Sequence, residues 1–158
     1  MPELSAEEII REKITAALPG KAENILIQRP RRLWLETKRG NLLETLTVLS
    51  KNLGFDHLST ITGIDLGDEL EFLYHLGGNQ QTLTVRTKAP AADPEIESVT
   101  PLFTGAAAYE RELVDMFGAK IKNLPPGNRY PLPDDFPADQ HPLRKSWKPS
   151  DLSKKEQV

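Results

Sequence analysis

The chain of 158 residues has the composition of one soluble globular domain, with 38% hydrophobic and 27% charged residues. No apolar run approaches the ~20 residues that a membrane-spanning helix needs, and the N-terminal MPELSAEEII lacks the basic start and apolar core of a secretory signal. We therefore expect a cytoplasmic chain with no membrane span of its own. A formal net charge of -3 argues against nucleic acid as the main partner, because phosphate binding depends on clustered Lys and Arg.

Cysteine is absent from the sequence. This excludes disulfides, thiolate nucleophiles and the usual protein ligands of iron–sulfur clusters. If the chain belongs to a redox system, we expect another subunit to hold the clusters.

Charge and proline divide the chain at Gly118. The first 118 residues carry 12 basic and 18 acidic side chains, and the last 40 carry eight basic and five acidic ones, together with seven of the 13 prolines. Each Pro fixes its own φ and removes a backbone donor, so the last segment cannot form an interior helix or a central strand. We predict a folded body over residues 1-118 and an extended, Pro-rich C-terminal arm over residues 119-158.

The body begins with a predicted helix followed by two strands. Ser5 and Glu8 form a capping box, and apolar residues then recur at helical spacing up to Leu18. The runs NILIQ, residues 24-28, and RLWLET, residues 32-37, are rich in β-forming residues. Their close spacing indicates a hairpin or two adjacent strands.

A second helix is predicted from Asn41, which repeats the capping pattern with Glu44, to a C-terminal cap at Gly54. Three strand patterns follow at residues 55-67, 69-77 and 81-88, and the sequence Gly-Gly-Asn at 77-79 predicts a hairpin between the last two.

The rest of the body is predicted to be helical. The pairs Asp93-Pro94 and Thr100-Pro101 each place a capping residue before a Pro suited to the first helical turn, so we expect a helix to begin near one or both. A last helix covers AAAYERELVDMF, residues 106-117, and Gly118 ends it. This order predicts an α+β fold, with a mixed, largely antiparallel sheet and flanking helices.

Few residues outside the last helix indicate chemistry. His57, His75 and His141 have no metal-site spacing, so we assign each a structural role, with an exposed imidazole at His75. The cluster of Asp65, Asp68, Glu69 and Glu71 lacks the spacing of a calcium loop and is interpreted as solvated strand ends.

The last helix raises a sharper question, because it carries four charges. Glu110 shares a face with Leu113 and Phe117 by its spacing, while Arg111 and Asp115 form an i, i+4 pair. Exposed charge is the commonest case, so the spacing alone favours a solvated flank with one ion pair. A catalytic cluster of carboxylates and a docking surface remain open alternatives.

The arm is too apolar for a disordered linker. Its aromatic residues Tyr130, Phe136 and Trp147 suit anchors on a surface, and Arg144 and Lys145 suit charge contacts. We expect the arm to run extended over a protein surface, either its own or a partner's.

Two sequence blocks resemble a known family. YERELVDMFGAKI, residues 109-121, resembles the signature of the 30 kDa subunit family of respiratory complex I, and YPLPDDF and HPLRK resemble elements that follow it in the same order. The family is shared by NADH and F420H2 dehydrogenases and by the related membrane-bound [NiFe] hydrogenases.

The resemblance implies a subunit of the peripheral arm without a cofactor of its own. Its partners would be the large subunit with the nickel or quinone site and a small iron–sulfur subunit, which would hold the iron–sulfur clusters and any nickel–iron centre. Together with the arm's aromatic anchors, it implies these partner-binding residues and no catalytic or metal-binding ones: Glu110, Arg111, Glu112, Asp115, Phe117, Gly118, Tyr130, His141, Pro142, Leu143, Arg144, Lys145 and Trp147.

Three departures from the complex I pattern favour the hydrogenase branch. They are Ala108-Tyr109 before the first motif, the segment 123-127 after it, and Ser146-Trp147 after HPLRK. We therefore expect a non-catalytic subunit that scaffolds the large subunit of a membrane-bound, ion-translocating [NiFe] hydrogenase. The alternative is the same role in a complex I-type NADH or F420H2 dehydrogenase. The rivals from other classes are a stand-alone enzyme that uses its carboxylates and a free-standing binding module.

Overall fold

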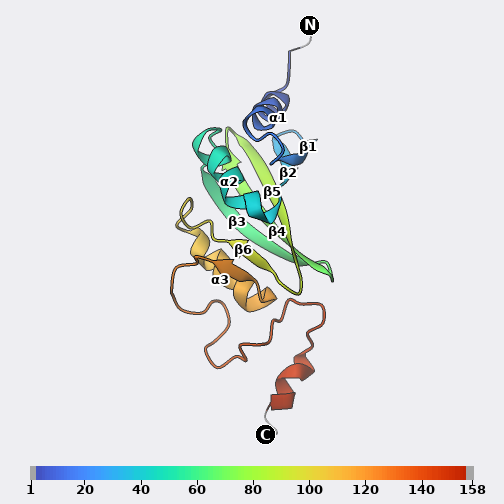
Figure 1. Ribbon diagram of the computed structural model, residues 1–158, viewed down its shortest axis with the longest axis vertical. Helices are drawn as coiled ribbons and strands as arrows, with labels where there is room; N and C mark the ends of the chain where they lie inside the picture. The colour runs from blue at the N-terminus through green and yellow to red at the C-terminus, as the bar shows by residue number, and fades with distance from the viewer. Residues whose placement is uncertain (1–2, 156–158) are drawn as a thin grey trace.

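The structure is a computed structural model that describes residues 3–155, with side chains described up to residue 152. Figure 1 shows a folded body with the C-terminal arm running below it. The elements in chain order are α1 (Ala6–Ala17), β1 (Glu23–Arg29), β2 (Arg32–Glu36), η1 (Arg39–Asn41), α2 (Leu42–Lys51), β3 (His57–Asp65), β4 (Glu69–Gly78), β5 (Gln81–Pro90), β6 (Glu95–Glu97), α3 (Ala106–Phe117), β7 (Lys120–Lys122) and η2 (Pro149–Lys155).

The main sheet has five strands in the order β1-β2-β5-β4-β3, and β6 and β7 form a separate pair. Three of its four strand pairings are antiparallel, whereas β2 and β5 run parallel, with Leu33 opposite Leu83 and Leu35 opposite Val85. The fold is therefore α+β with a mixed, largely antiparallel sheet, as the element order predicts.

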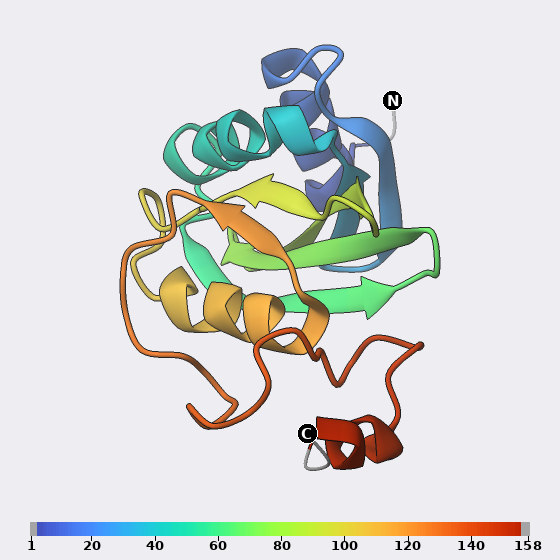
Figure 2. The same ribbon diagram turned by 60° about the horizontal axis from the view of Figure 1, so that its bottom comes forward.

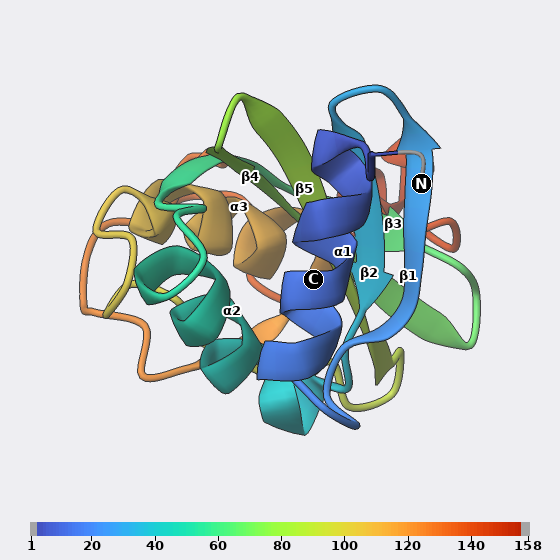
Figure 3. The same cartoon turned by 90° about the horizontal axis from the view of Figure 1, so that it is seen from above.

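One face of the sheet carries the hydrophobic core. Leu70, Phe72, Tyr74 and Leu76 alternate along β4, and all four are fully buried. Apolar residues of the three helices belong to the same core cluster. Figure 3 shows α1 and α2 lying next to each other, and Ile14 of α1 and Leu46 of α2 have no exposed surface. Burial of the apolar side chains of this core is the main contribution to the stability of the fold, at about 25 cal/mol per Å² of apolar surface.

The capping box predicted for α1 is confirmed, because Glu8 N donates to Ser5 Oγ and Ser5 N donates to the Glu8 carboxylate at 2.8 Å. The predicted cap of α2 is wrong. Asn41 makes no side-chain cap, since it is the last residue of the tight turn η1 and its backbone lies at φ -104°, ψ -1°. A capping residue adopts an extended backbone instead.

Two further details differ from the sequence predictions. The turn of the β4–β5 hairpin is Asn79-Gln80, both with positive φ, and Gly77 and Gly78 belong to β4. This is the two-residue turn whose twist matches that of paired strands. No helix begins at Asp93-Pro94, because Pro94 leads into β6 and its carbonyl accepts from Lys120 N of β7 at 2.9 Å.

The predicted start of the last helix at Ala106 is confirmed, but no helix begins at Thr100-Pro101. Residues 100–102 form turns, in which Leu102 N and Phe103 N both donate to the Val99 carbonyl, and α3 begins at Ala106. Its predicted end is confirmed, since Gly118 has the left-handed conformation, with φ 72°. Figure 2 shows the arm continuing from β7 and passing close to α3.

Candidate functional site

The four charges of α3 occupy four different environments. Glu110 has no exposed surface. Its Oε2 accepts from Ser98 Oγ at 2.7 Å and its Oε1 accepts from Val99 N at 2.6 Å. Burial raises the pKa of this carboxyl, and the two hydrogen bonds oppose that shift only in part. Glu110 therefore ties the loop before α3 to the helix from inside the protein.

The i, i+4 ion pair predicted between Arg111 and Asp115 does not form. Arg111 Nη2 donates instead to the Pro125 carbonyl at 3.1 Å, on the first part of the arm. Asp115 forms an ion pair with Arg129, whose Nε lies 3.1 Å from Asp115 Oδ1. Arg111 and Asp115 thus both bind groups of the arm. The intrahelical ion pair that they do not form would contribute only ~0.3 to 0.5 kcal/mol on an exposed helix surface.

Arg129 is the residue that the sequence reasoning missed. It donates to Asp115 and to the Phe136 carbonyl, and its guanidinium carbon lies 5.8 Å from the centre of the Phe136 ring. The second oxygen of Asp115 accepts from Leu132 N at 3.1 Å. Arg129 and Asp115 together fold the proline-rich segment into a compact loop. The sequence feature that could have indicated this role is the position of Arg129 in a Pro-rich segment, where regular structure cannot supply the hydrogen bonds.

The segment 141–144 caps the C-terminal end of α3. A helix leaves its last four carbonyl groups without partners in the helix. Here His141 Nδ1 donates to the Asp115 carbonyl at 2.9 Å, Leu143 N donates to the Met116 carbonyl at 3.0 Å, and Arg144 Nε donates to the Phe117 carbonyl. The two signature blocks therefore contact each other, because the second block completes the hydrogen bonding of the helix in the first.

Gly118 makes that close contact possible. A Cβ atom at this position would lie 2.7 Å from Cδ2 of the His141 ring, and the positive φ is one that side chains rarely adopt. The signature glycine therefore both ends the helix and leaves room for the histidine that caps it.

The arm has a third anchor on the sheet. Lys145 N donates to Asp65 Oδ2 at 2.8 Å, and Gly67 N donates to Asp65 Oδ1 at the same distance. The interpretation of the acidic cluster as solvated strand ends is wrong for Asp65 and Glu71, which are 8% and 6% exposed. Asp65 receives the arm, and Glu71 forms an ion pair with Arg86.

His75 is also less exposed than predicted. Its ring is half-buried on the sheet, where Nε2 lies 3.1 Å from Thr62 Oγ1 and Nδ1 lies 3.1 Å from Thr84 Oγ1. Burial lowers the pKa of this histidine. The contacts give it the structural role that its spacing suggested.

The remaining predicted site residues lie at or near the surface, apart from Phe117. Tyr130 and Leu143 are 51% and 48% exposed. The Lys145 side chain is exposed, and Pro142 and Trp147 are half-buried. Trp147 Nε1 donates to Gln140 Oε1 at 3.0 Å, within the arm. Glu112 is half-buried, and it is the one charge of α3 that has no hydrogen bond or ion pair with the part of the chain that the structure describes.

Phe117 fixes how close α3 lies to the sheet. A Cβ atom on Gly63 of β3 would lie 2.6 Å from the Phe117 ring and 2.9 Å from Leu113. The ring therefore lies directly over the backbone of β3, and Phe117 is 6% exposed. This packing makes Phe117 part of the core.

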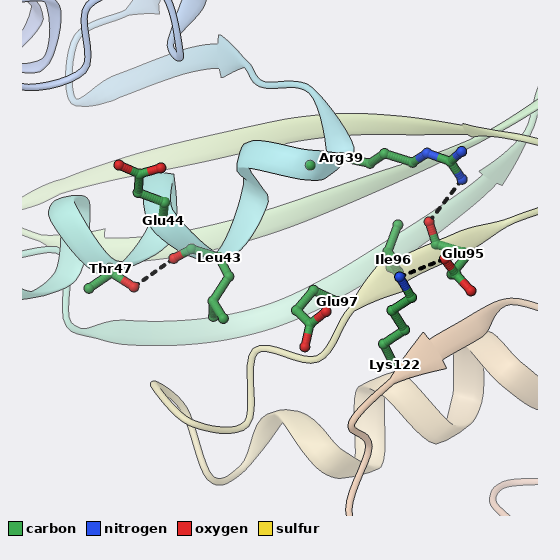
Figure 4. Close-up of a pocket in the computed structure, with 9 residues that line it drawn as sticks. Arg39, Leu43, Glu44, Thr47, Glu95, Ile96, Glu97 and Lys122 are labelled. Carbon is green, nitrogen blue, oxygen red and sulfur yellow. Dashed lines mark hydrogen bonds and ion pairs between the residues drawn. The ribbon is translucent and has the colours of Figure 1, made fainter.

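A groove of about 730 Å³ separates α2 from the β6–β7 pair. Figure 4 shows its lining, in which Arg39 Nη1 donates to the Glu95 carbonyl at 3.2 Å and Lys122 Nζ lies 2.9 Å from Glu95 Oε1. The groove's basic side chains are thus paired with groups of the chain itself. Within residues 3–155, no three His, Cys, Asp or Glu side chains are arranged to hold a metal ion, and no helix is long and apolar enough to cross a membrane.

The geometry gives Glu110 and Asp115, two of the three carboxylates of α3, little freedom to act as catalytic bases. Glu110 is sealed in the interior, and both oxygens of Asp115 accept hydrogen bonds. A general base needs a free lone pair within reach of a substrate proton. The site is better described as a helix end that holds an extended arm.

Such an α+β body with an arm folded over its last helix matches a class of subunits found in respiratory membrane complexes. Residues 35–152 match the family described as the respiratory-chain NADH dehydrogenase 30 kDa subunit. The chain belongs to this family.

Two relatives agree with this assignment. One subunit of the F420H2 dehydrogenase of Methanosarcina mazei is 34% identical over 148 residues, which cover 91% of this chain and 92% of the relative. One subunit of the NADH-quinone oxidoreductase of Citrifermentans bemidjiense is 39% identical over 115 residues, or 70% of each chain.

Two solved structures share the fold. A chain of the membrane-bound sulfane sulfur reductase, an archaeal respiratory membrane complex, aligns with a TM-score of 0.84 at 23% identity and covers 97% of this chain and 92% of its own length. The trypsin-resistant fragment of Nqo5, residues 1-134 of that protein, aligns with a TM-score of 0.63 at 26% identity and covers 76% of this chain and 98% of the fragment.

Proposed function

We propose that the chain is a non-catalytic scaffold subunit in the peripheral arm of a membrane-bound, ion-translocating oxidoreductase, where it docks on the large subunit that holds the quinone or nickel site. One observation carries the proposal: the signature residues of α3 and of the arm bond to each other at the C-terminal end of the helix. Iron–sulfur clusters and any nickel–iron centre belong to the partner subunits in this proposal, and the chain lies on the cytoplasmic side.

The relatives support a dehydrogenase assignment for the complex. The matching subunit of the F420H2 dehydrogenase and this chain cover more than nine tenths of each other. The arm's departures from the complex I pattern at Ser146-Trp147 instead favour a hydrogenase as the second candidate. Both assignments give the chain the same structural task.

Purification of the complex through an affinity tag on this chain tests the scaffold role. We expect a larger subunit and an iron–sulfur subunit to be recovered with it in equal amounts after detergent extraction of membranes. Recovery of the chain alone, under conditions that keep the rest of the complex intact, would contradict the proposal. Metal analysis of the same preparation separates the candidates, because nickel identifies a hydrogenase and its absence together with quinone or carrier reduction identifies a dehydrogenase.

A further inference from the structure

The arm is bonded to the body without being buried in it. From residue 120 to residue 152, not one side chain of the described chain is buried, whereas Ala119 just before this segment is 4% exposed. Its anchors are the polar contacts to Asp115, to the end of α3 and to Asp65. These hydrogen bonds are partly buried, so polar contacts more than burial of apolar side chains hold the arm on the body.

The outward side of the arm carries apolar groups. Tyr130 and Leu143 are each about half exposed, at 51% and 48%, although Leu143 N is bonded to the Met116 carbonyl. The backbone of the arm thus faces α3 at this point while the side chain remains accessible. Exposed aromatic and aliphatic side chains on a fixed backbone suit anchors that fill recesses in a partner protein.

Glu112 adds a charge near the point at which Leu143 is bonded. It lies one helical turn before Met116, whose carbonyl accepts from Leu143 N, and residues four apart are neighbours on a helix surface. Glu110, Arg111 and Asp115 all have partners within the chain, and Glu112 has none among the described residues. A basic side chain from another protein would stabilise the charged form of this half-buried carboxylate, which has lost part of its contact with water.

We propose that the arm is a strap held between α3 and a partner protein. Asp115, His141 and Arg144 position the strap from the inside. Glu112, Tyr130 and Leu143 contact the partner, whose surface supplies a basic side chain for the carboxylate and apolar recesses for the other two. This inference rests on the proposed scaffold function and names the chemistry of the docking surface. It divides the signature residues into an inward set that orders the arm and an outward set that binds.

Charge reversal tests the outward set. The Glu112→Lys and Leu143→Asp variants are each expected to reduce recovery of the large subunit at least tenfold when the tagged chain is purified with its complex. Glu12→Lys makes the same charge change at an exposed position of α1 and is expected to leave recovery unchanged. Normal recovery with Glu112→Lys would overturn the charge contact.

Hydrogen exchange tests the strap itself, with the full chain measured alone and in the complex. The amide of Leu143 is expected to exchange at least tenfold more slowly in the complex, because the partner covers the outer side of the arm. Arg144→Ala is expected to speed its exchange in the free chain, and Arg144→Lys, which keeps one donor, is expected to restore part of the protection.

The two tests fail in different ways. Equal exchange of the Leu143 amide in the free chain and in the complex would overturn the strap while leaving the scaffold role intact. A wild-type chain that does not associate with a large subunit would overturn the scaffold role.

Discussion

Arg129 donates a hydrogen bond to Asp115 across 3.1 Å, and their side chains are 19% and 8% exposed. The two residues are 14 positions apart, one on α3 and one in the arm. Partial burial reduces the screening of this pair by solvent, and it makes the loss of one partner costly because the other charge is left without a partner. This ion pair therefore fixes the position of the arm after β7 relative to α3.

Substitution of Asp115 by Asn is expected to weaken the attachment of the arm to α3. The change removes the charge and keeps the shape, so the contacts with Arg129 and with Leu132 N both weaken. Hydrogen bonds to charged groups contribute about 1.5 to 3 kcal/mol, so the amide of Leu132 is expected to exchange about ten- to a hundredfold faster. Asp134→Asn, at an exposed position of the same segment, serves as the control. An unchanged rate at Leu132 would show that the ion pair does not order the arm.

Gly63→Ala is expected to destabilise the body. The new Cβ atom would lie 2.6 Å from the Phe117 ring, so α3 must shift or the ring must leave its place. Overpacking of this kind costs about 1 to 3 kcal/mol of unfolding free energy, which urea denaturation measures. Gly105→Ala is the matched control, because a Cβ there meets no atom within 4 Å and φ is -68°. It is expected to be neutral or slightly stabilising, and equal losses for both variants would contradict the packing argument.

Glu110 is expected to make stability depend on pH. Burial raises its pKa above the ordinary value of 4.5, so the folded protein keeps this proton to a higher pH than the unfolded chain does. The contribution of this group to the free energy of unfolding therefore falls as pH rises from about 4.5 through the raised pKa. Glu110→Gln cannot titrate, so its stability is expected to fall less over the same range in urea denaturation. Parallel pH profiles for the two proteins would show that Glu110 titrates alike in both states.

Asp65 is expected to act in the opposite direction. Burial alone would raise the pKa of its carboxyl, but the N–H groups of Lys145 and Gly67 and the charges of Arg144 and Lys145 lower it overall. Its stabilising contribution is therefore present above pH 3.8 and is lost as pH falls through the lowered pKa. Asp65→Asn is expected to be less stable than the wild type at pH 7, by a margin that shrinks at lower pH. Asp68→Asn, at an exposed position of the same turn, is expected to show no such margin.

Local patterns in the sequence predict most of the body. The capping box at Ser5, the alternation along β4 and the glycine at 118 each specify an element through contacts between near neighbours. The parallel pairing of β2 with β5 depends on residues about 50 positions apart, which no local period reveals. A two-residue shift in the start of a turn, as at Asn79, also lies below what composition can resolve.

The sequence predicts some of the residues that meet at the end of α3, but not their contacts. The resemblance selects Asp115, His141 and Arg144, and all three meet at the end of α3. Their partners are carbonyl groups and amides of the backbone, which every residue carries and which no side-chain pattern identifies. For the same reason, the sequence assigned Asp115 to Arg111, its nearest cation on the helix, and missed Arg129.

The parallel strands β6 and β7 flank α3 in the chain and pair with each other, with Ile96 opposite Ile121, so the segment that contains the helix is a loop closed by backbone hydrogen bonds. The backbone hydrogen bonds of this pair hold the two ends of the segment side by side, in addition to the packing of α3 against the sheet. The position of the helix is therefore fixed by its chain connections as well as by the ring of Phe117 over β3.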